Sequence, residues 1–109
     1  MVNKHSNDGY IQMLEGVQRK TTVYGDKTLM SKFLLSGGYT VPDHSHPYEQ
    51  TGYLISGRMI FRIGDEEIEV QTGDSWSIPA DVVHGTRMLE DCVVLEVFSP
   101  ARQDYMPDK

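Results

Sequence analysis

Short apolar runs alternate with turn residues along most of the chain, and no window of a dozen residues shows a helical period of 3.6. In residues 67–71, Ile68 and Val70 alternate with charged or polar side chains, as expected for a half-buried strand. Residues 58–63 form another run, with Met59, Phe61 and Ile63 at alternate positions. The Gly64-Asp65-Glu66 segment between the two runs predicts a hairpin turn.

The remaining apolar runs are also predicted to be strands, because each one ends at residues that favour turns. From Val17 onward, strand and turn alternate, and residues 10–14 fit a helical turn or an edge strand equally well. Strands at short intervals with turns between them predict an all-β sandwich or barrel. The clearest further strands are residues 29–35, 53–55, 76–78 and 93–98, whereas residues 1–9 are polar and are expected to be loose.

Composition narrows the class of protein without naming an activity. The chain has 109 residues, a formal net charge of −6 and one cysteine, and its isoelectric point is about 5.0. This size suits one domain, and the acidic balance argues against nucleic acid and anionic membranes as partners. A single cysteine excludes an intrachain disulfide, and Cys92 is expected to be a small buried residue. With no apolar stretch long enough for a signal peptide or a membrane span, we expect a cytoplasmic protein.

The histidines are the first candidates for chemistry. His44 and His46 lie two residues apart, so an extended chain places both rings on one face. Two imidazoles on one face can converge on a metal ion, and Gln50 and His84 are placed to complete such a site. The His-X-His pair alone is a weak signal, because most histidines in strands are surface or hydrogen-bonded residues. His5 lies in the loose N-terminal stretch and receives no role.

The spacing around the histidines gives a more specific signal. Five residues separate Gly38 from His44-Ser45-His46, three more precede Gln50, and six lie between Gln50 and Gly57. This stretch resembles the first motif of the cupin superfamily, with Gln50 at the usual acidic ligand position and Glu49 one residue too early.

A second stretch resembles the second cupin motif. It runs from Gly73 over five residues to Pro79 and then to His84. The family usually has Gly where Asp81 stands and Asn where Met88 stands, and both differences leave His84 in register. The resemblance implies a single-domain cupin β-barrel (jelly roll) that holds one divalent transition metal ion (Ni, Fe, Zn, Mn, Co or Cu). The implied ligands are His44, His46, Gln50 and His84.

The last strong strand presents two different faces. One face carries Val94, Glu96 and Phe98, and the other carries only Val93, Leu95 and Val97. The apolar face is expected to pack against another sheet or a partner subunit, which would turn Glu96 into the barrel. Pattern alone also allows a surface strand with a solvated Glu96, and Arg102 after the strand is then solvated too. Trp76 and Tyr53 are expected in the core.

A narrower resemblance covers most of the chain, from about Gly16 to Tyr105. Residues 16–20, 44–50, 89–91 and 98–105 resemble the single-domain pectin-degradation cupins that linearise 4,5-unsaturated uronates. The resemblance implies a catalytic acid at Glu96, where the family usually has Asp. It also implies catalytic and substrate-binding roles for Arg102 and a substrate-binding role for Phe98. The expected cupin domain spans residues 16–105, between an N-terminal segment (1–15) and a tail (106–109).

Three functions remain open from the sequence. The resemblance favours an enzyme that opens the ring of an unsaturated sugar acid to a 4-deoxy-5-keto uronate. A metal-bearing binding module without turnover needs only the barrel and its pocket. A metal-dependent dioxygenase is the third, because His-rich sites also hold Fe(II). The apolar face of residues 93–97 and the segment 11–14 predict a homodimer, since exposed edges and apolar surface need covering.

Overall fold

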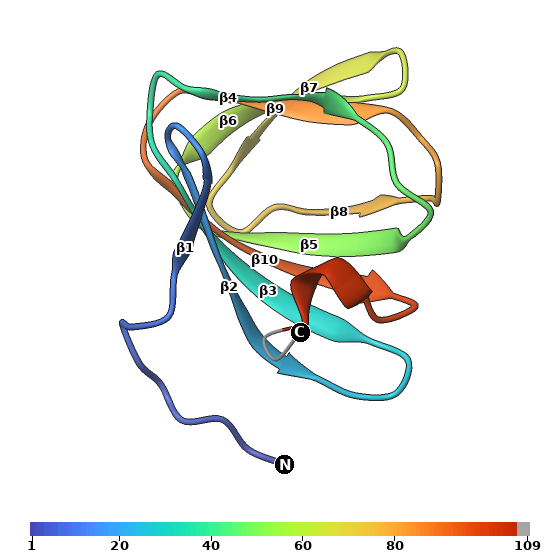
Figure 1. The fold of residues 1–109 in the computed structure, drawn as a ribbon. Coiled ribbons are helices and arrows are strands. Elements are labelled where there is room, and N and C mark those ends of the chain that lie inside the picture. Colours follow the sequence, from blue (N-terminus) through green and yellow to red (C-terminus); the bar gives the residue numbers. More distant parts are fainter. Residues whose placement is uncertain (107–109) are drawn as a thin grey trace.

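A computed structural model describes residues 1–106, and within them the chain forms two antiparallel sheets that face each other (Figure 1). The larger sheet has the strand order β1-β2-β3-β10-β5-β8, and the smaller one has the order β4-β9-β6-β7. One turn of 3-10 helix, η1 (Gln103–Tyr105), follows the last strand. The strands are β1 (Ile11–Leu14), β2 (Val17–Tyr24), β3 (Leu29–Leu35), β4 (Thr40–His44), β5 (Glu49–Ser56), β6 (Arg58–Ile63), β7 (Glu66–Gln71), β8 (Ser75–Ile78), β9 (His84–Met88) and β10 (Cys92–Ser99).

The all-β prediction is confirmed, and the arrangement is that of a jelly roll. Strand β10 lies between β3 and β5 and has the alternating burial that its sequence predicted. Residues 10–14 contribute an edge strand, β1, which pairs with β2. Two strands were not predicted: β4 and β9 carry His44 and His84, and few of their residues are apolar. Strand pairing places these two histidines opposite each other.

Three expectations about individual side chains differ in the structure. Tyr53 is 48% exposed on the outer face of the larger sheet, so it does not belong to the core. Ile68 is also exposed, because β7 lies at the edge of its sheet and buries only Val70. The face of Val93, Leu95 and Val97 is half-buried, and neither sheet formed by residues 1–106 covers it.

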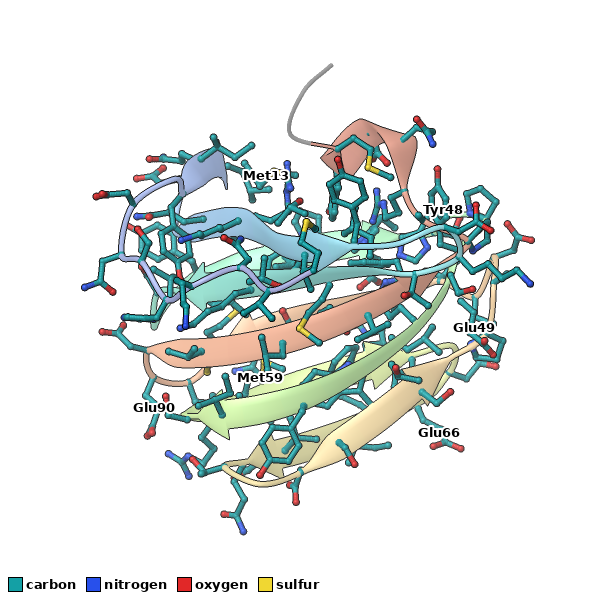
Figure 2. All side chains as sticks on the ribbon, turned by 90° about the horizontal axis from the view of Figure 1, so that it is seen from below. Met13, Tyr48, Glu49, Met59, Glu66 and Glu90 are labelled. Carbon is teal, nitrogen blue, oxygen red and sulfur yellow. The ribbon has the colours of Figure 1, made fainter. Side chains whose placement is uncertain are left out.

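The core lies between the two sheets. Its main cluster includes Leu54, Phe61, Trp76 and Val94, and a smaller cluster joins Leu29 and Phe98 to Tyr105 of η1. Figure 2 labels Tyr48 and Glu90 at opposite ends of the strands, which mark the two ends of the interior. Cys92 of the main cluster donates from its Sγ to the Glu90 carbonyl oxygen, whereas the ring centre of His46 lies 5.8 Å from that of Tyr48.

The turn before β9 explains one difference from the cupin motif. Asp81 has a φ of 69°, in the left-handed region that favours glycine. Asp adopts this region more readily than most other residues, so the turn keeps its shape without the glycine. The Asp81 backbone N–H also donates to the carbonyl oxygen of His46 at 2.8 Å, which fastens the turn to the histidine segment. The expected tail, residues 106–109, lies outside the described residues except for Met106.

Candidate metal centre

The structure brings three of the four histidines together at one end of the sandwich. His44 ends β4, His84 begins β9, and His46 lies in the loop before β5. Their ligand nitrogens all lie within 4.8 Å of one another. His46 and His84 are almost completely buried, whereas His44 is exposed at the mouth of the site. His5 is not part of the cluster.

Backbone carbonyl groups fix the tautomer of each ring. The Nδ1 atoms of His44, His46 and His84 lie 2.9, 3.1 and 2.8 Å from the carbonyl oxygens of Pro42, Tyr48 and Val82. A carbonyl oxygen only accepts, so each Nδ1 carries the proton and each Nε2 keeps a free lone pair. Ligand histidines in metalloproteins are oriented in the same way.

Gln50 is the fourth predicted ligand, and its position fits a metal ion. Its Oε1 lies 2.8 Å from Nε2 of His46, and two lone pairs at that distance repel each other unless a cation lies beside both. The Nε2 atom of His84 is buried and has no hydrogen-bond partner among the described residues. A cation held by these atoms would satisfy all of them, so the residues present fit a divalent transition metal ion.

Burial keeps the two inner histidines in the form that binds metal. Desolvation is the main reason why the pKa of His84 is lowered to about 4; the hydrogen bond to the Val82 carbonyl opposes the shift, and the neighbouring histidines and Arg102 contribute to it. Desolvation is also the main cause of the lowered pKa of His46, with a contribution from Arg102. Both rings are therefore neutral at neutral pH, and a metal ion does not have to displace protons from them.

Glu96 lies inside the barrel, which excludes the alternative of a solvated surface residue. It is 5% exposed, and the two oxygens of its carboxyl group lie 3.1 and 3.3 Å from the indole Nε1 of Trp76, whose N–H donates to them. Burial raises the pKa of Glu96 to about 8, although hydrogen bonds from Trp76 and Gln50 oppose the rise. In the barrel without a bound metal ion this side chain is therefore mostly an uncharged carboxylic acid at neutral pH, and it then has a proton to donate.

Arg102 is not solvated either. Its side chain is 11% exposed and forms a two-point pair with Asp104, at 3.2 Å from Nε and 2.7 Å from Nη2. The guanidinium carbon lies 3.8 Å from the ring centre of Tyr105 and 4.8 Å from that of Phe98. Because the pair with Asp104 uses Nε and Nη2, the Nη1 hydrogens remain for an anionic ligand.

Sequence reasoning missed several residues around the site. Tyr105 stacks on Arg102 on one side, and Arg19 lies 3.7 Å from the same ring centre. Two guanidinium groups so close to one ring centre cannot share a face without overlapping, so they sandwich the ring. Tyr48, whose carbonyl oxygen holds His46, packs 4.9 Å from Arg102. Arg19 and Tyr105 lie within the segments that carried the family resemblance, so that resemblance was the available signal.

One cavity joins these groups. It has a volume of about 400 Å³ and lies between the two sheets. At one end the four predicted ligands, Glu96, Phe98 and Arg102 line it. At the other end its walls are apolar and consist of Leu14, Val17, Phe33, Leu35, Met59, Phe61 and Val94. The cavity can hold a small organic molecule in contact with both the metal ligands and the buried acid.

Comparison with known proteins supports the same architecture. Residues 31–98 match the family described as Cupin domain. A protein of Streptomyces coelicolor is 31% identical over 97 residues, which cover 87% of this chain and 84% of that protein. That protein is described as uncharacterised, so the match indicates no activity.

Solved structures resemble this chain over nearly its whole length. KdgF from a Halomonas species has a TM-score of 0.91 and 24% identity, and the match covers 97% of this chain and 100% of KdgF. An RmlC-like cupin from Shewanella frigidimarina has a TM-score of 0.90 and 21% identity, with 96% and 95% covered. The polyketide cyclase RemF from Streptomyces resistomycificus follows with a TM-score of 0.81 and 22% identity, and 94% and 82% covered. At these identities the likeness concerns the fold.

Proposed function

Because this chain belongs to the cupin family, we propose that it is a metal-dependent enzyme that opens the ring of 4,5-unsaturated uronates. The observation that carries the proposal is one cavity with three kinds of group along its wall. These groups are a histidine-rich metal site, an uncharged buried acid at Glu96 and a cation at Arg102. The resemblance to the pectin-degradation cupins and the structural likeness to KdgF support the substrate class.

The reaction is an isomerisation that moves one proton. In the substrate the ring oxygen belongs to an enol ether at C5 and to a hemiacetal at C1. Ring opening breaks the bond between C1 and the ring oxygen, removes the proton of the C1 hydroxyl and adds a proton at C4. The ring oxygen then becomes the C5 ketone oxygen and C1 becomes an aldehyde, so no oxidant or reductant is needed.

The residues of this chain suit the proton transfer at C4 and the binding of the substrate. The proton lost from the C1 hydroxyl passes to solvent water, which returns a proton to Glu96 after Glu96 has protonated C4. We assign the proton at C4 to Glu96, because burial keeps its carboxyl group protonated at neutral pH. Arg102 binds the substrate carboxylate through its free Nη1 hydrogens, and Phe98 forms the apolar wall beneath it.

We assign His44, His46, Gln50 and His84 as the ligands of the metal ion. All four are neutral, so a bound divalent ion keeps its full charge and acts as a strong Lewis acid toward substrate oxygen atoms. Nickel, iron, zinc, manganese, cobalt and copper all suit imidazole and amide donors. Elemental analysis of the purified protein identifies the ion.

A ring-opening assay tests the proposed reaction. Unsaturated galacturonate is incubated with the metal-loaded protein, and the loss of the C4–C5 double bond is followed by ultraviolet absorbance, with oxygen uptake measured in parallel. We expect the absorbance to fall faster than in buffer, without oxygen uptake. Substrate binding without turnover would favour a binding module, and oxygen consumption would favour a dioxygenase.

We propose that the chain acts as a cytoplasmic homodimer. The outer face of the larger sheet carries half-buried Val93, Leu95 and Val97 beside Tyr53 and Ile55, which are 48% and 38% exposed. A second copy on this face would cover the apolar row. No helix in the described part of the chain is long and apolar enough to cross a membrane. Light scattering at micromolar concentration should give a dimer mass, and a monomer near 12 kDa contradicts this arrangement.

A further inference from the structure

Glu96 and Trp76 contact each other across a strand that lies between them. Glu96 on β10 pairs with Gly52 on β5, and Gly52 pairs with Trp76 on β8. The three residues therefore form one row across the larger sheet, and their side-chain positions face the same side. The outer strands of such a row are roughly 9.5 Å apart, so side chains meet across it only where the middle position is vacant.

Gly52 has no side chain, and the side chains of Trp76 and Glu96 meet in the space that one would fill. A Cβ atom on Gly52 would lie 2.2 Å from Nε1 of Trp76 and 2.5 Å from Oε2 of Glu96. Gly52 does not have a positive φ, so the backbone there suits any residue. Glycine is required at position 52 because any side chain there would block the contact between the indole N–H and the carboxyl group.

Trp76 is itself held firmly in place. It is 9% exposed, and its ring packs against Phe61 with 4.9 Å between ring centres. The indole N–H donates to both oxygens of Glu96, and the Gln50 side chain reaches the same carboxyl group from the metal site. The carboxyl group is thereby fixed between a rigid donor and a predicted metal ligand.

We propose that Trp76 is the positioning residue for the Glu96 carboxyl group and that Gly52 provides the gap through which it acts. The inference rests on the proposed function, in which Glu96 is the catalytic acid. It also explains how the protein uses a glutamate, which is one methylene longer than the aspartate usual in the pectin-degradation cupins. The longer side chain lies across Gly52 and is bound at its end by Trp76. An acid held in this way keeps one orientation toward the substrate.

Kinetics of two variants test the positioning role. Trp76→Phe keeps an aromatic ring against Phe61 but removes the N–H donor, so kcat for ring opening should fall roughly 10- to 100-fold with little change in KM. Gly52→Ala should lower kcat in the same way, because its methyl group displaces the indole or the carboxyl group. Gly25→Ala is the matched control, since a Cβ there meets nothing within 4 Å and φ is not positive. Met88→Ala controls for loss of stability alone, because Met88 is buried in the main core cluster away from the cavity wall.

A spectroscopic measurement tests the contact without any substrate. The chain has one tryptophan, so a ¹⁵N-labelled sample gives a single indole N–H resonance. Glu96→Leu removes the acceptor, and we expect that resonance to move upfield and its hydrogen to exchange faster with solvent. Met88→Ala should leave both properties unchanged.

The two measurements separate failure of the inference from failure of the proposed function. If the wild type does not open the ring but the indole resonance responds to Glu96→Leu, the reaction is wrong and the contact stands. An active wild type with equal kcat in Trp76→Phe and Met88→Ala overturns the positioning role. An indole resonance that ignores Glu96→Leu overturns the contact itself. Trp76→Phe does not change Gly52, so its kinetics still test the positioning role if Gly52→Ala does not fold.

Discussion

The two ends of the cavity are built from opposite kinds of residue. At the histidine end, polar groups are buried at a cost: His84 Nε2 has no hydrogen-bond partner among the described residues, and burial raises the pKa of Glu96 to about 8. At the other end, Leu35, Met59 and Phe61 pack into the main core cluster, where no side-chain nitrogen or oxygen atom within residues 1–106 is both buried and without a hydrogen-bond partner. Burying polar groups costs stability unless they are satisfied, whereas burying apolar area supplies it.

The contrast indicates that one end of each strand stabilises the fold and the other end carries the candidate site. Strand β10 carries Val94 toward the apolar end and Glu96 and Phe98 toward the histidine end, so one rigid element serves both. The apolar end fixes the relative positions of the sheets, and the histidine end uses that rigidity to hold groups that would not come together unaided. Changes at the histidine end should therefore affect chemistry more than folding, and changes at the apolar end should do the reverse.

The largest effect is expected from removing two histidines together. His44→Ala with His46→Ala leaves too few ligands, so the protein should lose its metal ion completely while it stays folded. Elemental analysis after gel filtration measures the metal, and circular dichroism measures the fold. Stoichiometric metal in the double variant would contradict the ligand assignment.

A truncation at the apolar end is the matched comparison. Leu35→Ala should lower the free energy of unfolding by about 2–5 kcal/mol, because Leu35 is 6% exposed and its truncation removes buried apolar contacts and enlarges the cavity that it lines. The metal content of the folded protein should not change. Loss of metal in this variant at a temperature where it is folded would show that the two ends are not separate in function.

The next largest effect concerns the buried acid. Glu96→Gln keeps the size of the side chain and an acceptor for the Trp76 N–H, but it has no acidic proton to give. Turnover should fall by roughly 10²–10⁴ with unchanged metal content. Steady-state kinetics of ring opening with metal analysis of the same sample checks this. An equally active variant would remove Glu96 from the mechanism.

Arg102 should have a smaller and different effect. Arg102→Ala removes a charge-assisted contact of about 1.5–3 kcal/mol to the substrate carboxylate, so KM should rise about 10- to 150-fold. Asp104 loses its partner in this variant, and Arg102→Ala with Asp104→Asn separates that consequence from the loss of substrate binding. If KM stays at the wild-type value in both variants, the carboxylate binds elsewhere.

The strands could be predicted from the sequence wherever burial alternates along the chain. Strand β10 has that alternation, and the orientation of its faces followed from it. Strands β4 and β9 could not be found in this way, because the residues that define them serve the site and interrupt the apolar pattern. Motif spacing brought His44, His46, Gln50 and His84 into one hypothesis, and the fold places them side by side.

The contact between Glu96 and Trp76 lay beyond what the sequence could predict. The two residues are 20 positions apart, and they meet only because β5 places a glycine between them. Strand order and register decide such a contact, and neither is written in the local pattern of either strand. The same holds for Tyr105, whose ring lies between two arginines that are distant in the sequence.

The last prediction is a pH dependence of stability that arises from Glu96. Its pKa is about 8 in the folded protein, against an ordinary value of 4.5. Between these values the folded state holds a proton that the unfolded state has lost, so rising pH favours unfolding by at most about 1.4 kcal/mol per pH unit. Below pH 4.5 both states hold the proton, and above pH 8 both have lost it, so stability does not change with pH outside this range.

Urea unfolding of the metal-free wild type and of Glu96→Gln measures the difference, since all other titrating groups are common to both. The wild type should lose stability relative to the variant as pH rises from 4.5 to 8. Parallel curves over this range would mean that the folded barrel holds Glu96 as a carboxylate, and the proton donor of the reaction would then have to be another group.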